Sequence, residues 1–239
     1  MKTSFLPYEA LLGQSSSSFD FRQLLDERKI LLCDLSKGSL GPDVTSLLGS
    51  LVVTKLALAA LSRQDTPEEE RTPHFLYADE VQNFVYGVDL PTILAESRKY
   101  RLALIMATQT LSLLPELTLA AVLGNCATIA SFRVSGADAE ILEREFAATL
   151  PARELQNLDD YTLYLHTLVD GATAGPYLLR TLAPGRRTGQ EAAAERVIAA
   201  SMQRYGRPRA IVEAKLRAFL SIAPKVERAR PTLVTREHP

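Results

Sequence analysis

Short apolar runs alternate with amphipathic stretches along most of the chain. An apolar run of about four to eight residues is typical of a strand buried on both faces, whereas apolar positions three or four apart indicate a helix that faces a core. Strands are predicted at residues 29–35, 74–80, 102–109 and 127–134. Helices are predicted between them at residues 19–28, 43–63, 90–100, 116–123 and 136–150. This alternation predicts an α/β fold with a mainly parallel sheet and helices on both faces.

The pattern changes towards the carboxyl end of the chain. Two more strands are predicted at residues 161–166 and 177–181, joined as a hairpin through Asp170–Gly171, because an Asp-Gly pair favours tight turns. From Arg186 onward the strand signal stops and Ala-rich amphipathic stretches predict helices.

Four segments follow from these patterns. We expect a flexible entry that ends in a serine run, an α/β domain, a basic helical tail and a disordered end. Their predicted ranges are residues 1–18, 19–185, 186–223 and 224–239.

Charge is unevenly distributed along the 239 residues, although the formal net charge is only −1. Residues 1–185 hold 15 basic and 23 acidic side chains, a balance of −8, and residues 186–239 hold 12 and 5, a balance of +7. A basic tail on an acidic body indicates contact with DNA or with a neighbouring subunit. The alternative is a helical lid whose arginines face water. The candidate contact residues are Arg204, Arg207 and Arg209.

The longest apolar run, residues 48–61, is interrupted by Lys55 and is shorter than the roughly 18 residues that a membrane span needs. We therefore expect a cytoplasmic chain, with any membrane association provided by a part of the protein that is not present here.

Asp79 and Glu80 lie at the carboxyl end of the predicted strand at residues 74–80, where ligands bind in open α/β sheets. Two acids at such a point suit nucleotide hydrolysis. The first would hold the water shell of a Mg²⁺ ion, and the second would orient or deprotonate the attacking water. The alternative is a strand that runs into a solvated turn.

The next predicted strand also ends in polar residues, Thr108 and Gln109. Two successive strands that both end in polar side chains favour the catalytic interpretation over a solvated turn. The spacing of 29 residues from Glu80 to Gln109 suits one crossover connection, which needs at least about 10–12 residues.

These ordered motifs resemble the C-terminal half of the ATPase domain in HerA/FtsK superfamily proteins, in particular the type IV secretion (conjugation) coupling proteins. The resemblance covers about residues 19–183, through KILLCDLSKG, FLYADEVQNF, LALIMATQ and ATIASFRV. It implies a RecA-like P-loop NTPase fold, ATP with Mg²⁺ as cofactors, a hexameric ring and translocation of DNA.

The resemblance also implies roles for single residues. Asp79 would be the Walker B acid that holds Mg²⁺ through water, Glu80 the catalytic acid and Gln109 the sensor of the γ-phosphate. Arg133 would be an arginine finger or an inter-subunit arginine, and the alternative is a strand-end arginine paired with Asp138 or Glu140. Arg98, Lys99 and Arg101 would face DNA or a neighbouring subunit, and the alternative is a solvated helix end.

One part of the family pattern is missing. A P-loop needs GxxxxGK[ST], and the chain has no Gly-Lys dipeptide. We therefore expect the C-terminal part of a larger DNA-translocating ring ATPase, active only when the P-loop part is supplied. The first alternative is a non-catalytic RecA-like binding or assembly module. A weaker one is a metal-independent enzyme that uses Asp79 and Glu80 as an acid/base pair.

Overall fold

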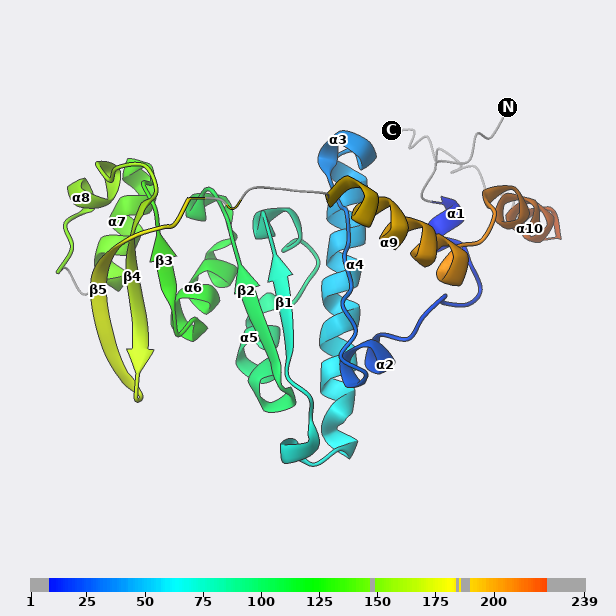
Figure 1. The fold of residues 1–239 in the computed structure, drawn as a ribbon, viewed down its shortest axis with the longest axis horizontal. Helices are drawn as coiled ribbons and strands as arrows, with labels where there is room; N and C mark the ends of the chain where they lie inside the picture. Colours follow the sequence, from blue (N-terminus) through cyan, green and yellow to red (C-terminus); the bar gives the residue numbers. More distant parts are fainter. Residues whose placement is uncertain (1–8, 147–148, 184, 186–189, 223–239) are drawn as a thin grey trace, which may run out of the picture. The chain divides into compact units, whose positions relative to one another are not determined.

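The computed structural model describes residues 9–146, 149–183, 185 and 190–222. The chain divides into two compact units, of which Asp20–Thr188 is the larger. The larger unit contains α2 (Phe21–Asp26), α3 (Lys37–Leu40), α4 (Pro42–Leu61), β1 (His74–Ala78), α5 (Leu90–Glu96), β2 (Leu102–Met106), α6 (Glu116–Asn125), β3 (Ile129–Ser131), α7 (Gly136–Glu145), α8 (Ala152–Gln156), β4 (Thr162–Val169) and β5 (Ala172–Arg180) (Figure 1).

The other unit combines the two ends of the chain. Its described helices are α1 (Glu9–Leu12), α9 (Gln190–Tyr205) and α10 (Arg209–Ile222). Helices are therefore present in the predicted basic tail, whereas the predicted disordered end, residues 224–239, lies outside the described residues.

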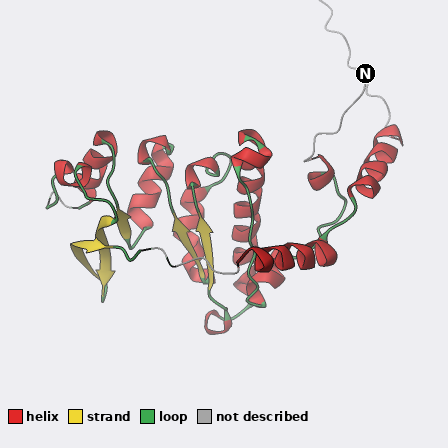
Figure 2. Ribbon diagram, turned by 45° about the horizontal axis from the view of Figure 1, so that its top comes forward, coloured by secondary structure: helices red, strands yellow, loops and turns green. Residues whose placement is uncertain are grey.

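The strands form two separate sheets (Figure 2). β1 and β2 pair in parallel, with Ala78 opposite Met106, whereas β3, β4 and β5 form an antiparallel sheet. The prediction of a mainly parallel sheet is thus wrong for the described residues. The run at residues 127–134 forms only the three-residue β3. It pairs with the hairpin strand β4, because Ile129 and Tyr164 both pack into the apolar cluster around α7 and α8.

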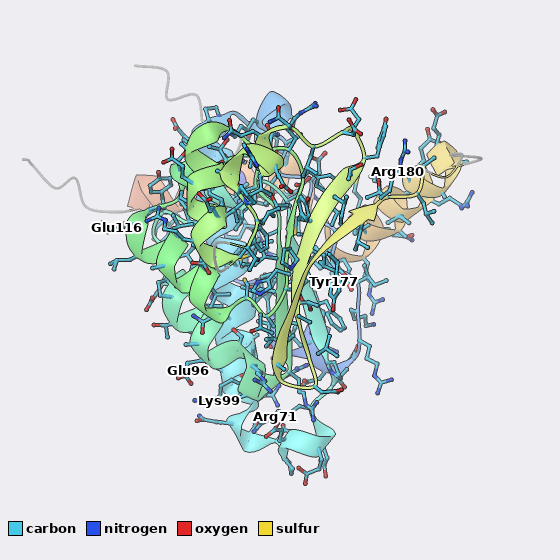
Figure 3. All side chains as sticks on the ribbon, turned by 90° about the vertical axis from the view of Figure 1, so that its left-hand side faces the viewer. Arg71, Glu96, Lys99, Glu116, Tyr177 and Arg180 are labelled. Carbon is cyan, nitrogen blue, oxygen red and sulfur yellow. The ribbon has the colours of Figure 1, made fainter. Side chains whose placement is uncertain are left out.

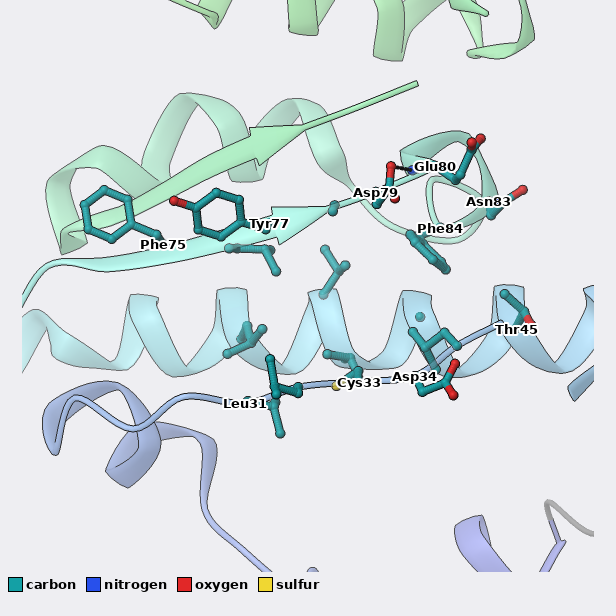
Figure 4. Close-up of a pocket in the computed structure, with 18 of the residues that line it drawn as sticks. Leu31, Cys33, Asp34, Thr45, Phe75, Tyr77, Asp79, Glu80, Asn83 and Phe84 are labelled. Carbon is teal, nitrogen blue, oxygen red and sulfur yellow. Dashed lines mark hydrogen bonds between the residues drawn. The ribbon is translucent and has the colours of Figure 1, made fainter. Parts of the chain in front are cut away.

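The predicted strand at residues 29–35 is also not formed. This segment is extended and runs beside α4 (Figure 4). A cleft separates it from β1. Ile30 and Leu32 are 87% and 78% exposed, so the run has the apolar composition of a buried strand without a neighbouring strand to bury it. An apolar run therefore predicts a strand correctly only where a pairing edge is available.

Helices cover one face of the parallel pair. Leu76, Leu102 and Leu104 pack against α2 and α4, and Leu104 with Met106 packs against α5 and α6. The opposite face exposes Phe75 and Tyr77, at 57% and 73%. The prediction of helices on both faces is therefore wrong within the described residues.

Helix α4 is the central support of the parallel pair. The segment Pro42–Asp65 is long and apolar enough to cross a membrane by length and composition. In the fold, Val53, Leu56 and Ala60 of α4 are buried in the protein core, whereas Leu47, Leu51 and Leu58 of the same helix are exposed.

The hairpin prediction is confirmed. β4 and β5 are antiparallel and joined through Asp170 and Gly171, which have φ angles of 53° and 80°. Two successive positive φ angles match the right-handed twist of the flanking strands.

The amino ends of β1 and β2 are held together by Arg63, which is 1% exposed. Its guanidinium bonds the carboxylate of Asp26 at 3.0 Å and donates to the carbonyls of Thr72 and Tyr100 at 2.8 and 3.1 Å. One buried cation thus joins α2 and α4 to the residues that lead into both strands.

A glycine on α4 accommodates the loop that follows β1. The ring of Phe84 occupies the space that a Cβ atom at Gly49 would fill (Figure 4). The hydroxyl of Ser50 lies 3.2 Å from the carbonyl oxygen of Phe84 and 3.0 Å from that of Tyr86. The loop after the acid pair is therefore docked on the same helix that supports the sheet.

Gly49→Ala is expected to lower the free energy of unfolding by about 1–3 kcal/mol, because the new methyl group overlaps the Phe84 ring. Gly124→Ala in α6 is the matched control, since a Cβ there meets open space and alanine favours a helix by up to about 1 kcal/mol. Urea unfolding measures both. A stabilised Gly49→Ala variant would contradict this packing.

The pKa of His74 lies below its ordinary value of 6.5, because the ring is partly buried and because Arg63 is close. The folded state therefore binds a proton at His74 less readily than the unfolded chain. The stability that depends on a neutral His74 is present above pH 6.5 and is lost as the pH falls through the lowered pKa. We expect His74→Gln to show a flatter pH dependence of urea unfolding between pH 5 and 7. Identical slopes for both proteins would refute this role for His74.

Candidate functional site

The two acids form the turn that follows β1. Glu80 has a left-handed backbone, with φ 54° and ψ 49°. Strand pairing continues past this turn, since Ala107 N donates to Ala78 O and Val81 N donates to Ala107 O, both at 2.9 Å. A left-handed non-glycine residue costs on the order of 1–3 kcal/mol and persists where the surrounding structure holds it. The turn therefore fixes both carboxylates at the carboxyl end of the parallel pair (Figure 4).

Two side-chain amides engage the Glu80 carboxylate. Gln109 Nε2 donates to one oxygen, and Gln82 Nε2 donates to the other. Gln82 Oε1 in turn accepts a bond of 2.8 Å from the hydroxyl of Thr108. Two residues predicted from strands far apart in sequence, Glu80 and Gln109, are thus in direct contact. The donors are neutral, so the carboxylate is oriented without a cation to neutralise it.

Asp79 differs from Glu80 in its surroundings. Its Oδ1 accepts a bond of 3.1 Å from the backbone N–H of Glu80, and the residue is exposed. An exposed carboxylate beside a second one offers oxygen ligands to a hard cation such as Mg²⁺ or to the water around it. Among the described residues no group of three or more His, Cys, Asp and Glu side chains could hold a metal ion.

The acid pair lies at the polar end of a cleft of about 1390 Å³. The cleft is lined by β1, by α4 and by the extended segment at residues 28–37 (Figure 4). Phe75, Tyr77 and Leu31 contribute apolar lining, and Asp79, Glu80 and Gln109 contribute polar lining. The site is therefore open to a ligand or to another polypeptide.

Arg133 lies away from this cleft. It is exposed, and its guanidinium bonds Asp160 at 3.0 Å and the carbonyl of Leu158 at 3.2 Å. The alternative of a strand-end arginine in an ion pair named Asp138 or Glu140 as the partner, whereas the pair is formed with Asp160. An exposed ion pair of this kind is worth only about 0–1 kcal/mol, so Arg133 can exchange Asp160 for another anion.

Asp138 is a candidate that the sequence did not single out for the site. It is buried, at 1% exposure, and accepts bonds from the backbone N–H groups of Leu111 and Ser112 at 3.0 and 3.1 Å. The available signal was its spacing from Leu142, because residues four apart lie on one helix face and Leu142 faces the core. An acid on the apolar face of a helix needs a partner.

The predicted basic contacts lie elsewhere. Arg98, Lys99 and Arg101 are exposed at the amino end of β2, opposite to the end that carries the acids. Lys99 pairs with Glu96 at 2.8 Å (Figure 3). A five-residue strand separates the two ends by about 16 Å, so these cations do not act on the acid pair directly.

The three arginines of the tail are exposed as well. Arg204 lies over the ring of Tyr205 at 5.4 Å, and Arg209 pairs with Glu213 at 2.6 Å. Arg207 donates to the hydroxyl of Ser16 at 3.2 Å. All three are thus accessible, with weak surface contacts to neighbouring side chains.

Part of the chain matches a described family, and the fold is similar to solved structures. Residues 73–155 match the family described as "TraM recognition site of TraD and TraG". No curated protein matches the chain. Among solved structures, the bacterial conjugative coupling protein TrwBdeltaN70, in its unbound form, matches with a TM-score of 0.51 at 16% identity, over 68% of this chain and 43% of that one.

Two further structures of the same coupling protein are similar. TrwB in complex with the GTP analogue GDPNP has a TM-score of 0.52 at 16% identity, over 68% of this chain and 43% of that chain. TrwB in complex with the ATP analogue ADPNP has a TM-score of 0.51 at 17% identity, over 68% and 42%. The chain thus spans less than half the length of these proteins, and the likeness shows the fold.

The family match contains the acid pair, the Gln109 strand, Arg133 and Asp138. The fold match extends the agreement to most of the chain. The chain is therefore type IV secretion coupling-protein-like: residues 73–155 match the TraD and TraG family, and the fold is similar to that of TrwB.

Proposed function

We propose that this chain supplies the hydrolysis half of a DNA-translocating ring ATPase related to the conjugative coupling proteins. One observation carries the proposal. Glu80 and Gln109, from the ends of neighbouring parallel strands, are in direct contact in a left-handed turn that opens on a cleft. A carboxylate held by a neutral amide suits a group that must orient water and then respond to a phosphate.

The proposed roles follow from the surroundings of each side chain. Asp79 is exposed and holds the water shell of a cation. Glu80 orients and deprotonates the attacking water, and Gln109 fixes the position of the Glu80 carboxylate and contacts the terminal phosphate. When bound with a nucleotide, Mg²⁺ offsets the negative charge of the phosphates.

The residues of this chain fit the cation-binding part of a nucleotide hydrolysis site and do not fit its phosphate-binding part. The carboxylates of Asp79 and Glu80 suit a hard cation. A phosphate cradle requires a P-loop, and the sequence contains no Gly-Lys dipeptide. The TrwB structures carry GDPNP and ADPNP, so we infer that ATP is held by a P-loop outside these 239 residues.

Exposed cations provide the remaining proposed contacts. Arg133 has only a surface ion pair with Asp160 to exchange, so a phosphate of a neighbouring subunit's nucleotide can replace that carboxylate. The cations at the amino end of β2 and the tail arginines contact DNA phosphates or adjacent subunits of a ring, which we propose to be hexameric. Such contacts weaken with salt and carry little sequence preference.

The family description suggests a protein partner as well. In TraD and TraG the matched region is described as a TraM recognition site. We propose that residues 73–155 face a TraM-like partner in this protein too.

The absence of a P-loop sequence favours a second candidate, a non-catalytic module that binds or assembles with other subunits. The two candidates differ in what Glu80 does. In a module the carboxylate is part of the fold and carries no chemical step.

The test uses an assembly in which this chain is joined to a P-loop half. Glu80→Gln is nearly isosteric and is expected to lower the turnover of ATP by about 10²–10⁴-fold with nucleotide binding retained, because it removes the base. Turnover and binding of a fluorescent ATP analogue are measured together. The matched control is Glu140→Gln, since Glu140 is an exposed residue of α7 outside the cleft.

Unchanged turnover in Glu80→Gln would exclude the catalytic role and favour the module. Equal losses in Glu80→Gln and Glu140→Gln would indicate an effect of charge and would likewise contradict the proposal.

A further inference from the structure

Asp138 holds the loop that carries Gln109. The carboxylate accepts from two consecutive backbone N–H groups, Leu111 N to Oδ2 at 3.0 Å and Ser112 N to Oδ1 at 3.1 Å. These residues are only two and three positions after Gln109. A buried carboxylate is costly unless it accepts hydrogen bonds, and charge-assisted bonds are stronger than neutral ones. The pair of bonds therefore fixes the direction of the loop backbone.

The other end of the same loop is held by the parallel strand pair. Ala107 exchanges backbone bonds with Ala78 and Val81, both at 2.9 Å. Thr108 bonds Gln82 through its hydroxyl at 2.8 Å. Gln109 thus lies between two fixed points, one on β1 and one on α7. Its exposed side chain donates to the Glu80 carboxylate.

Apolar packing alone does not set this geometry. The side chain of Leu111 packs against two apolar clusters, one around α7 and α8 and the other around α5 and α6. That contact holds the loop in place as a whole. The orientation of the peptide groups is set by what accepts their N–H groups, and in both cases the acceptor is Asp138.

We propose that Asp138 is a positioning residue, which aligns Gln109 with Glu80 by binding the backbone of the Gln109 loop. An effect of Asp138 on hydrolysis rests on the proposed function. The alignment of Gln109 with Glu80 by Asp138 does not depend on that function. The proposal makes α7 part of the site, although none of its side chains lines the cleft.

The alignment is tested by NMR on this chain, with no nucleotide present. Asp138→Asn keeps the shape but turns an NH₂ group towards one of the two N–H donors. We expect the Gln109 side-chain amide resonances to move towards those of a glutamine that has no hydrogen bond to a carboxylate. We also expect exchange of the Leu111 and Ser112 amides to accelerate at least about tenfold.

Leu111→Ala is the matched control, because it removes packing and leaves the carboxylate with both donors. At a comparable loss of stability it is expected to leave the Gln109 resonances in place. Unchanged Gln109 resonances in Asp138→Asn, or equal shifts in both variants, would overturn the proposal.

A measurement on the unsubstituted chain covers the case in which Asp138→Asn does not fold. Scalar coupling through the hydrogen bond, from the Ser112 amide nitrogen to the Asp138 carboxyl carbon, is expected together with slow exchange at Ser112. Fast exchange without coupling would overturn the proposal. A chain that passes these tests yet shows no role for Glu80 in turnover would refute the proposed function and leave the alignment standing.

Discussion

The parallel pairing of β1 with β2 is the constraint on which the site depends. Parallel strands end at the same edge, so residues that follow them meet there although 29 positions separate Glu80 from Gln109. The backbone bonds of Ala107 extend the pairing beyond the regular strands and define the turn at Glu80. Without that register the side chains of Glu80 and Gln109 would not be brought into contact.

The two ends of this strand pair are held by different kinds of interaction. At the amino end, the buried Arg63 binds Asp26 and the carbonyls of Thr72 and Tyr100, which gives a rigid junction between helices and strands. At the carboxyl end, neutral amides, hydroxyls and backbone groups surround the Glu80 carboxylate. The anionic end opens on the cleft, and both of its acids lie within residues 73–155, the range that matches the TraD and TraG family.

The sequence predicted the elements that depend on local pattern. The strands predicted at residues 74–80 and 102–109 form over 74–78 and 102–106, and the Asp170–Gly171 hairpin forms as predicted. Glu80 and Gln109 were predicted at the ends of their strands, and the structure adds their contact. It did not predict pairing, since an apolar run such as residues 29–35 has the same composition with or without a partner strand. The ion pair of Arg133 with Asp160 and the bonds of Asp138 join segments more than 20 residues apart, which no local pattern encodes.

The central claim is that Asp79 and Glu80 form a site for a hydrated divalent cation. Cation binding at this site can be measured on this chain directly. In a titration with Mn²⁺ followed by NMR, the claim predicts that the amide resonances of Asp79 and Glu80 and the side-chain amide of Gln109 broaden first. It also predicts that Asp79→Asn removes this selectivity. If broadening begins instead at the exposed run Glu68–Glu70, or if Asp79→Asn leaves the pattern unchanged, the carboxyl end of the parallel pair is not a cation site and the account is contradicted.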